Sequence, residues 1–462
     1  MTRERWLTLF VVSASTAMLL LDVTVVNVAL PVIGEDLGAS FDELQWVIDA
    51  YALALAATLL TAGVLADRHG RRRVFAIGLA AFTLCSALCG AANSGVVLDV
   101  ARGLQGIGAA AMFAASLAIL AQEFQGRERG FALGVWGAIT GAALALGPLV
   151  GGVLVDALSW RWVFLVNLPV GAALIWLTLR RLPESRDTTP RGLDALGLLT
   201  FAAAAFLGTF GLIRGNADGW GSATVTGSLA TAAVLLAAFV VVERRGRSPM
   251  LPPALFRIPA FTGTAVVAFA QSFALYPLFL FLAVYLQGVL HYSATGTGLR
   301  LLPLTLVLFA VAPLSGKLTG RVPLRVPLVA GLLLIATSLL LMRGLDPQSG
   351  WTELLPGFVV GGIAIGTISP ALAAAMVGVL SIERSGLASG VNNTFRQLGI
   401  AVGIAALGAI FQHHVGLGAP GSAEAVVDAL NAIFLVAAGV AVAGAAIAWP
   451  LLGGLRSPEA GR

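Results

Sequence analysis

The chain has 462 residues, of which 58% are hydrophobic and only 11% are charged. Soluble proteins carry about 25% charged residues, so this composition excludes a soluble protein and indicates one that is embedded in lipid. The net charge of +5 does not indicate a nucleic-acid-binding protein, because the basic residues lie in short loops between apolar segments and form no continuous basic face.

Apolar segments long enough to cross about 30 Å of hydrocarbon recur along the whole chain. The first is too long for the core of a signal peptide, so we expect it to be an uncleaved span. The sequence therefore predicts an all-α integral membrane protein with fourteen transmembrane helices. The fourteen spans lie near residues 7–30, 47–66, 74–93, 96–121, 131–155, 162–179, 195–213, 223–242, 261–287, 296–315, 326–342, 354–378, 387–411 and 428–452.

The basic residues predict how these helices are oriented. If the N-terminus is cytoplasmic, 22 of the 28 lysine and arginine residues fall in cytoplasmic segments, as the positive-inside rule requires. We therefore expect a multi-pass protein of the cell (plasma) membrane with both termini in the cytoplasm. The single lysine, Lys317, beside 27 arginines and 55 glycines suggests a GC-rich bacterial genome.

The loop after the second span, from Gly63 to Arg73, is rich in arginine. The arginine cluster cannot enter hydrocarbon, which places this loop at the cytoplasmic face. We expect it to be a gate that latches two halves of the protein together, with the Glu383–Arg384 region or the start of the thirteenth span as its partner. The gate residues are Gly63, Asp67, Arg68, Gly70, Arg71 and Arg72.

A fainter copy of the same loop follows the tenth span. The pattern at residues 63–68 recurs at 316–321, with Gly320 in place of the aspartate. This register makes spans 1–6 and 9–14 two related six-helix bundles, with spans 7 and 8 as two inserted helices. Repeated halves of this kind are how many secondary transporters are built. We expect an N-terminal bundle at 1–180, a linker with the inserted helices at 181–258, and a C-terminal bundle at 259–462.

The fifth span contains small residues on shared helical faces, and such faces let neighbouring helices approach closely. Its proline removes one backbone hydrogen bond and bends the helix. A plain tight helix contact explains the pattern equally well without any further role. The residues of this motif are Gly137, Gly141, Gly147, Pro148, Gly151 and Gly152.

The loop at 63–73 resembles the signature Gly-x-Leu-x-Asp-Arg-x-Gly-Arg-[Arg/Lys]-[Arg/Lys] of the major facilitator superfamily. The fifth-span motif, the Arg-Gly-Leu-Gln-Gly stretch at 102–106 and the Trp-Arg-Trp stretch at 160–162 resemble the fourteen-helix drug:proton antiporter branch of that superfamily. The resemblance covers nearly the whole chain. It implies transport by alternating access, and the fifth-span motif is typical of exporters, which favours efflux over uptake.

A charged pair in the N-terminal bundle is the candidate proton-coupling site. Asp22 lies about 12 Å below the outer end of its span, and Arg102 lies at a similar depth in the fourth span. An intramembrane carboxylate faces the protein interior and is protonatable or paired. Asp22 either carries the coupling proton or is a structural partner of Arg102, and Asp49 is a second candidate. Asp99, one turn before Arg102, is an alternative local partner for it.

The C-terminal bundle has no acid deep in its spans, and its polar interior groups are mostly amides. In the thirteenth span Asn392 and Arg396 lie four residues apart on one face. Hydrogen bonding between helices and contact with substrate explain such groups equally well. We expect the substrate cavity to include Asn27, Gln105, Gln271, Asn393 and Arg396.

These features predict a proton-coupled antiporter that exports small amphipathic organic compounds. A proton arriving from outside would neutralise Asp22, and a cationic substrate competing for the same carboxylate would give exchange directly. A dedicated exporter of one metabolite, antibiotic or lipid is the alternative. A membrane enzyme or a non-transporting sensor is disfavoured, because no catalytic arrangement and no signalling domain is recognisable. We expect no cofactor beyond the proton motive force, no metal, no nucleic acid, and a monomer in the lipid bilayer.

Overall fold

The apolar runs of the sequence all form helices. The computed structural model describes residues 2–39, 41–186, 194–246, 251, 253–318, 322–379, 385–417 and 422–454. Within these ranges every regular element is helical, as the sequence predicts for an all-α membrane protein. Twelve helices are long and apolar enough to cross a membrane, while Arg325–Leu341 and the apolar run Phe131–Ala143 are shorter. The exact number of fourteen spans stays a prediction.

The first half of the chain contributes seven helical pieces. The sixth predicted span is divided at Val166 into a single turn and a longer helix. The pieces are α1 (Arg3–Leu37), α2 (Phe41–His69), α3 (Arg71–Gly90), α4 (Gly95–Glu123), α5 (Gly126–Ala157), α6 (Trp162–Leu165) and α7 (Asn167–Arg181).

Two helices follow in the middle of the chain, α8 (Ala195–Asp218) and α9 (Ala223–Arg245). The second half begins with a 3-10 turn, Pro253–Arg257, and α10 is continued by a π-helical turn, Tyr285–Val289. Its helices are α10 (Pro259–Val284), α11 (Ala294–Leu318), α12 (Arg325–Leu341), α13 (Leu355–Val379), α14 (Ser385–Leu417) and α15 (Ala423–Leu451), with short 3-10 turns at Trp351–Leu354 and Leu452–Gly454.

Polar caps start several of these helices. Ser94, Ser222 and Ser422 each accept a hydrogen bond from the backbone N–H three residues further on, at the beginnings of α4, α9 and α15. The first N–H groups of a helix have no partner within the helix, so a serine oxygen satisfies one of them. A single serine thereby caps the start of each of these three helices.

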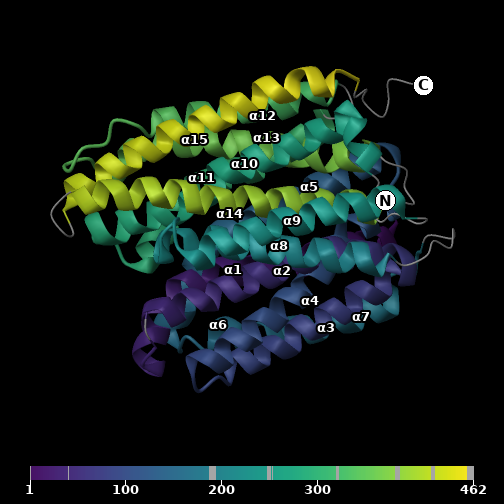
Figure 1. Ribbon diagram of the computed structural model, residues 1–462, viewed down its shortest axis with the longest axis horizontal. Helices are drawn as coiled ribbons and strands as arrows, with labels where there is room; N and C mark the ends of the chain where they lie inside the picture. The colour runs from purple at the N-terminus through teal and green to yellow at the C-terminus, as the bar shows by residue number, and fades with distance from the viewer. Residues whose placement is uncertain are drawn as a thin grey trace.

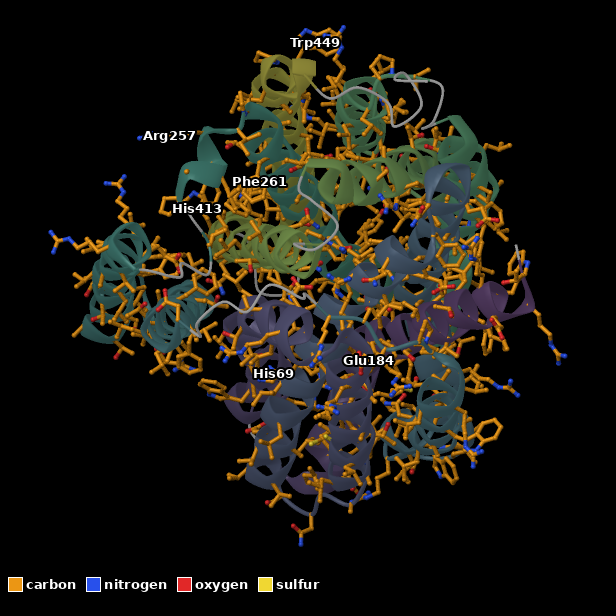
Figure 2. All side chains as sticks on the ribbon, turned by 90° about the vertical axis from the view of Figure 1, so that its right-hand side faces the viewer. His69, Glu184, Arg257, Phe261, His413 and Trp449 are labelled. Atoms are coloured by element: carbon orange, nitrogen blue, oxygen red, sulfur yellow. The ribbon has the colours of Figure 1, made fainter. Side chains whose placement is uncertain are left out.

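The helices of the two halves meet along two seams. α5 packs against α11 and α13, and α14 packs against α2 and α4. α8 and α9 pack on each other, and α8 lies against α2 and α14. Viewed along the helix axes, α8 and α9 form a pair beside the main body of the molecule (Figure 2). α1 begins and α15 ends at the same end of the molecule (Figure 1). The seams therefore bring α4, α5, α11, α13 and α14 together at the centre.

Candidate functional site

Asp22 and Arg102 meet inside the N-terminal half. Arg102 on α4 donates from a guanidinium NH group to Asp22 Oδ2 on α1 at 2.6 Å. The side chain of Asp22 is 0% exposed and that of Arg102 is 2% exposed. Asp99, the alternative partner, forms no ion pair with Arg102 in the part of the chain that the structure describes. The pair joins α1 to α4 in the protein interior.

Three further side chains complete a hydrogen-bonded network around this pair. Gln105 Nε2 donates to Asp22 Oδ1 at 3.1 Å and to Ser86 Oγ at 2.8 Å. Asn167 Nδ2 donates to the same carboxylate oxygen at 3.0 Å. Arg102 also donates to Gln105 Oε1 at 2.6 Å. A buried charge is tolerated only when it is paired and hydrogen-bonded, and Asp22 receives donors from α4 and α7.

Arg102 is enclosed on its remaining sides by aromatic rings. Its guanidinium lies 4.3 Å from the ring centroid of Tyr51 and 5.8 Å from that of Phe164. Its Nε donates to the backbone oxygen of Val47 at 2.9 Å. The buried hydroxyl of Tyr51 has no hydrogen-bond partner among the described residues. We define the Asp22 network as Asp22, Tyr51, Ser86, Arg102, Gln105 and Asn167.

Sequence reasoning proposed only part of this network. The sequence did not single out Asn167, Ser86 or Tyr51 as partners of Asp22 and Arg102. The available signal was polarity, because Asn167 is an amide at the start of an otherwise apolar span. Gln105 was expected in the substrate cavity. That placement is corrected, because Gln105 is 0% exposed and is held in the network.

Asp49 lies on α2 outside the hydrogen bonds of the Asp22 network. Its electrostatic neighbours are Arg214 of α8 and Asp99 of α4. Arg214 also forms an ion pair with Asp218 at 2.6 Å, within the same helix. Charged residues of α2, α4 and α8 therefore lie within electrostatic range of one another in this second region.

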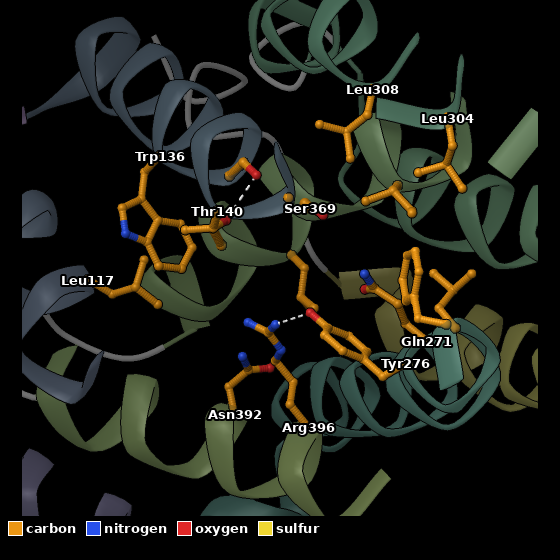
Figure 3. A pocket seen from close by; sticks show the side chains of 17 residues that line it. Leu117, Trp136, Thr140, Gln271, Tyr276, Leu304, Leu308, Ser369, Asn392 and Arg396 are labelled. Atoms are coloured by element: carbon orange, nitrogen blue, oxygen red, sulfur yellow. Dashed lines mark hydrogen bonds between the residues drawn. The ribbon is translucent and has the colours of Figure 1, made fainter. Parts of the chain in front are cut away.

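A cavity lies between the two halves, where the seams converge (Figure 3). Its empty space is about 750 Å³, including open solvent. The wall combines aromatic and aliphatic side chains with a few polar groups. Its lining residues from the N-terminal half are Leu117, Trp136, Gly137, Thr140 and Gly141. Those from the C-terminal half are Gln271, Leu275, Tyr276, Phe279, Leu304, Leu308, Ile365, Ser369, Leu372, Ala373, Asn392 and Arg396.

The predicted cavity residues are distributed unevenly. Gln271 and Arg396 line the cavity. On α14 it is Asn392 that lines it, whereas Asn393, one position further round the helix, is 2% exposed and does not. The side chain of Asn27 lies outside the described residues. Asp22 does not line the cavity either, so a cationic substrate bound here would not touch the carboxylate.

Arg396 is anchored by an aromatic group inside the cavity. Its guanidinium donates a hydrogen bond to the hydroxyl of Tyr276, and the two side chains point toward each other in Figure 3. The guanidinium also lies 5.7 Å from the ring centroid of Phe113 on α4. A residue of the C-terminal half therefore contacts a helix of the N-terminal half through its charged end.

The motif glycines of α5 face two different neighbours. A Cβ added at Gly147 would collide with Thr24 of α1, and one at Gly151 would lie 3.0 Å from Val25 of the same helix. By contrast, a Cβ at Gly141 would lie 2.8 Å from Leu308, and one at Gly152 2.8 Å from Thr295, both on α11. Gly137 faces Ser369 of α13. One part of α5 is thus fitted to the helix that carries Asp22, and the other faces the opposite half.

The charged stretch at 63–73 is not an extended loop, because residues 63–69 end α2 and residues 71–73 begin α3, with Gly70 between them. It is held to the segment that follows α7. Arg71, 1% exposed, binds Asp67 at 2.9 Å and also donates to Gln122 of α4. Glu184 accepts hydrogen bonds from the backbone N–H groups of Arg72 and Arg73, at the positive end of α3. In the end-on view of Figure 2, His69 and Glu184 lie near each other, in agreement with these hydrogen bonds.

Gly70 connects α2 to α3 with a φ of 109°, which residues with a Cβ rarely adopt. A Cβ there would also lie 2.7 Å from the Glu184 carboxylate. Among the other gate residues, Gly63 is buried and Arg68 is exposed. The expected partner segment at 380–384 lies outside the described residues.

The Trp-Arg-Trp stretch closes the other end of the N-terminal half. Trp160 Nε1 donates to Asp36 at 2.9 Å, and Arg161 donates to the same oxygen at 2.7 Å. The hydrogen bonds from Trp160 and Arg161 hold the pKa of the Asp36 carboxyl below its ordinary value of 3.8. Arg161 also lies over the Trp160 ring, 4.3 Å from its centroid. This cluster ties the end of α1 to the turn between α5 and α6.

A multi-helix membrane protein whose two halves enclose a cavity, with a buried charge pair in one half, has the architecture of a secondary transporter. Comparison with known proteins agrees. The chain belongs to the Major Facilitator Superfamily, whose family model matches residues 12–404 and 264–462. It is therefore a multi-pass membrane protein of a transporter family rather than an enzyme.

The relatives in sequence are bacterial resistance and export proteins, which confirms the predicted relation to the drug-efflux members of this superfamily. The chain is 39% identical to the multidrug resistance protein Stp of Mycobacterium tuberculosis, over 89% of this chain and 76% of that protein. It is 37% identical to the puromycin resistance protein pur8 of Streptomyces alboniger, over 97% of this chain and 92% of that protein. It is 36% identical to the tetracenomycin C resistance and export protein of Streptomyces glaucescens, over 89% and 77%.

Solved structures share the fold. The human organic anion transporter MFSD10 (TETRAN) superposes with a TM-score of 0.73 at 16% identity, over 97% of this chain and 100% of that one. The proton:xylose symporter XylE superposes with a TM-score of 0.69 at 11% identity, over 96% and 95%. At such low identities these likenesses show the fold alone.

Proposed function

We propose that this protein exports small organic compounds across the cell membrane in exchange for protons, by alternating access between its two halves. The observation that carries the proposal is the separation of a buried carboxylate network from the cavity, with α5 lining the cavity and packing on α1 beside Asp22. The named relatives, which are resistance and export proteins, support efflux over uptake. The finer assignment is a monomer of fourteen spans with bundles at 1–180 and 259–462, inserted helices at 181–258, and both termini cytoplasmic.

Protonation of Asp22 is the proposed coupling event. The ionised carboxylate accepts hydrogen bonds from Arg102, Gln105 and Asn167, which belong to α4 and α7. A proton on Asp22 removes the charge that these donors stabilise and turns one acceptor oxygen into a donor. The network must then rearrange, so the free energies of its alternative helix arrangements change.

α5 is the proposed connection between this event and the substrate. Thr24 and Val25, which follow Asp22 closely on α1, are the residues against which Gly147 and Gly151 are fitted. Further along α5, Trp136 and Thr140 line the cavity, and Trp136 Nε1 donates to Thr16 of α1 at 3.2 Å. A shift of α1 against α5 therefore changes the shape of the cavity wall.

In this arrangement the substrate and the proton do not compete for one carboxylate, and their binding is coupled indirectly. Asp22 lies outside the cavity, so the substrate and the proton do not need to share one carboxylate. Instead each binds one conformation of the two halves more tightly, and the two binding equilibria are linked through that conformational change. Asp49 remains the second candidate for the proton, through its neighbours Arg214 and Asp99.

The loop at 63–73 is the proposed cytoplasmic latch. Asp67 and Arg71 form an ion pair, and Arg71 also donates a hydrogen bond to Gln122 of α4. A movement of α4 therefore shifts Arg71 and, through it, Asp67. Asp67→Asn should reduce transport while the protein remains inserted and folded. Labels at residue 185 and at the C-terminus should be cytoplasmic, and one near Gly418 external.

The breadth of substrates separates two forms of this proposal. A multidrug exporter would protect an efflux-deficient host against many unrelated toxic compounds, whereas a dedicated exporter would protect it against one. The relatives include proteins of both descriptions, named for multidrug resistance and for single antibiotics. A sensor or a membrane enzyme would give no retention difference for any labelled compound between cells with and without the protein.

The decisive experiment uses purified protein in vesicles with an imposed pH gradient. Asp22→Asn matches the protonated acid in size and polarity but cannot release a proton. We expect it to lose gradient-driven accumulation to background, by about 100-fold or more, while substrate exchange without a gradient continues. Asp49→Asn is measured in parallel because Asp49 is the second candidate; if Asp22 carries the proton, this variant should retain at least half of the accumulation. Accumulation by Asp22→Asn driven by pH alone would make Asp49 the leading candidate.

A further inference from the structure

The cavity carries a positive charge and no negative one. Arg396 is the sole charged residue among those that line it in the described part of the chain. The C-terminal helices that form its wall, α10, α11, α13 and α14, contain no aspartate or glutamate anywhere in their sequences. From the N-terminal half, α4 and α5 contribute only uncharged lining residues.

The geometry leaves the guanidinium of Arg396 able to bind another group. Arginine has five N–H donors and stays protonated in proteins. Among the described residues its one hydrogen-bond partner is the Tyr276 hydroxyl, and no acid forms an ion pair with it. Arg102 differs, because it has a carboxylate, an amide oxygen and a backbone oxygen as acceptors. A cation held between helices without a counter-ion is a binding site for an anion.

The surroundings of Arg396 fit a flat carboxylate. Asn392 lies one turn before Arg396 on the same face of α14, and both line the cavity. A guanidinium binds a carboxylate through two parallel hydrogen bonds, and an adjacent amide can donate a third. Trp136, Phe279 and Leu304 supply apolar walls for the rest of the molecule. Apolar walls with few polar groups are typical of sites for small organic ligands.

We infer that the preferred substrates are aromatic organic acids carried as monoanions, with the carboxylate bound by Arg396. This inference rests on the proposed function, because it names the chemical class that the export cavity accepts. An organic cation of the same shape meets the charge of Arg396 without any acid in the cavity to offset it. The neutral analogue keeps the apolar contacts but loses the paired hydrogen bonds.

The guanidinium of Arg396 also links substrate binding to the interface between the two halves. Arg396 belongs to α14, yet its guanidinium lies 5.7 Å from Phe113 on α4, and the Phe113 ring packs at 5.9 Å on Trp136 of α5. A carboxylate that draws the guanidinium away from Tyr276 and Phe113 changes a contact between the halves. Substrate binding thereby favours one arrangement of the two halves over the other.

The test compares three ligands of one ring system: anthracene carboxylate, anthracene carboxamide and aminomethylanthracene. They are anionic, neutral and cationic at neutral pH. Binding to purified protein is measured by quenching of tryptophan fluorescence, since Trp136 lines the cavity. We expect the carboxylate to bind at least about tenfold more tightly than the ammonium compound, with the carboxamide between them.

Variants at Arg396 assign the preference to that side chain. Arg396→Gln should weaken carboxylate binding by about tenfold and leave carboxamide binding within about twofold, and Arg396→Lys should be intermediate. Arg343→Gln removes a positive charge from an exposed position of the same half and should change neither. Thermal unfolding shows whether each variant is folded. If Arg396→Gln does not fold, Tyr276→Phe is used instead. This variant keeps the charge of Arg396 and should retain the preference for the carboxylate.

Two outcomes overturn the inference: tighter binding of the ammonium compound to the wild type, or an unchanged carboxylate preference in Arg396→Gln. Failure of the proposed function is seen separately, in vesicles. Charge-selective binding without any gradient-driven transport would contradict the proposed export but would still support the anion site. Gradient-driven transport that favours the cation would contradict the anion site and leave export standing.

Discussion

The two halves of this protein treat a buried arginine in opposite ways. In the N-terminal half Arg102 is 1% exposed and is bound to Asp22, Gln105 and a backbone oxygen. In the C-terminal half Arg396 is more exposed, faces the cavity and has a tyrosine hydroxyl as its partner in the described structure. One arginine is a component of a closed network, and the other faces an open cavity.

The amides of the two halves differ in the same way. Gln105 and Asn167 each donate twice within the Asp22 network. Asn392 and Asn393 each keep one buried amide atom without a partner among the described residues. A satisfied network holds its helices in one arrangement, whereas the unsatisfied amide of Asn392 lies at the cavity and is available to a bound molecule. The N-terminal half therefore has a closed polar network, and the C-terminal half has polar groups that face the cavity.

The largest contrast is expected between the two arginines. Arg102→Met leaves Asp22 buried without its charge partner, which should destabilise the protein by about 3–5 kcal/mol. Arg396→Met should cost less than about 1 kcal/mol, because no buried carboxylate is left unpaired. Thermal unfolding of the purified variants measures both. The double variant Asp22→Asn/Arg102→Met should recover much of the loss, and equal destabilisation by the two single variants would refute the contrast.

The amides provide a second, smaller contrast. Asn167→Ala removes a hydrogen bond to a buried charge and should destabilise by about 1.5–3 kcal/mol. Asn392→Ala should alter ligand binding and change stability by less than about 0.5 kcal/mol. Unfolding curves and binding curves for both variants test this. A stability loss for Asn392→Ala as large as that for Asn167→Ala would show that the C-terminal amides are structural.

The two faces of α5 should differ in their tolerance of a methyl group. Gly147→Ala places a Cβ into Thr24 and should destabilise by about 1–3 kcal/mol through overpacking. Gly137→Ala faces Ser369 at an ordinary contact distance of 3.5 Å and should change stability by less than about 0.5 kcal/mol. Combining Gly147→Ala with Thr24→Ala should restore part of the stability. Without such rescue, the fit between α1 and α5 would not be the cause.

The smallest effect concerns Asp36 and depends on pH. Its folded-state pKa is depressed below 3.8, so its contribution to stability is present above that value and is lost as the pH falls through the folded-state pKa. The wild type should therefore be more stable than Asp36→Asn at neutral pH, and the two unfolding temperatures should converge at acidic pH below that point. Trp160→Phe removes the hydrogen bond from Trp160 to Asp36, so it should reduce the difference in unfolding temperature that Asp36→Asn causes at neutral pH. A gap that persists unchanged at low pH would contradict this assignment.

The positions of the helices followed from the sequence, because burial in lipid requires long apolar runs and leaves charges only at their ends. Each of the predicted spans coincides with a helix, although the break at Val166 gave no signal in hydropathy. The meeting of Asp22 and Arg102 was also anticipated from their depths in two spans. Depth along a helix can be counted in residues, and that is why this part succeeded.

Rotation about the helix axis could not be obtained from one sequence. Gln105 was assigned to the cavity, yet its face of α4 is directed at α1 and α3, where Asp22 and Ser86 lie. Asn393 was chosen over Asn392 for the same reason, since one residue of difference turns a side chain by about 100° around the helix. In uniformly apolar helices no polar face reports this rotation. Partners such as Asn167 and Glu184 depend on contacts between distant segments and were equally invisible.

The Asp22 network and the cavity have no residue in common. A substitution can therefore change the cavity without changing the network, or the reverse. A substitution at Leu117, Phe279 or Leu304 can change which compound fits while every bond to Asp22 is kept. Under the proposed function, changes in the wall of the cavity would alter which compound is exported, while the proposed coupling site is kept. Relatives named for compounds as different as puromycin and tetracenomycin C are what such divergence would leave behind.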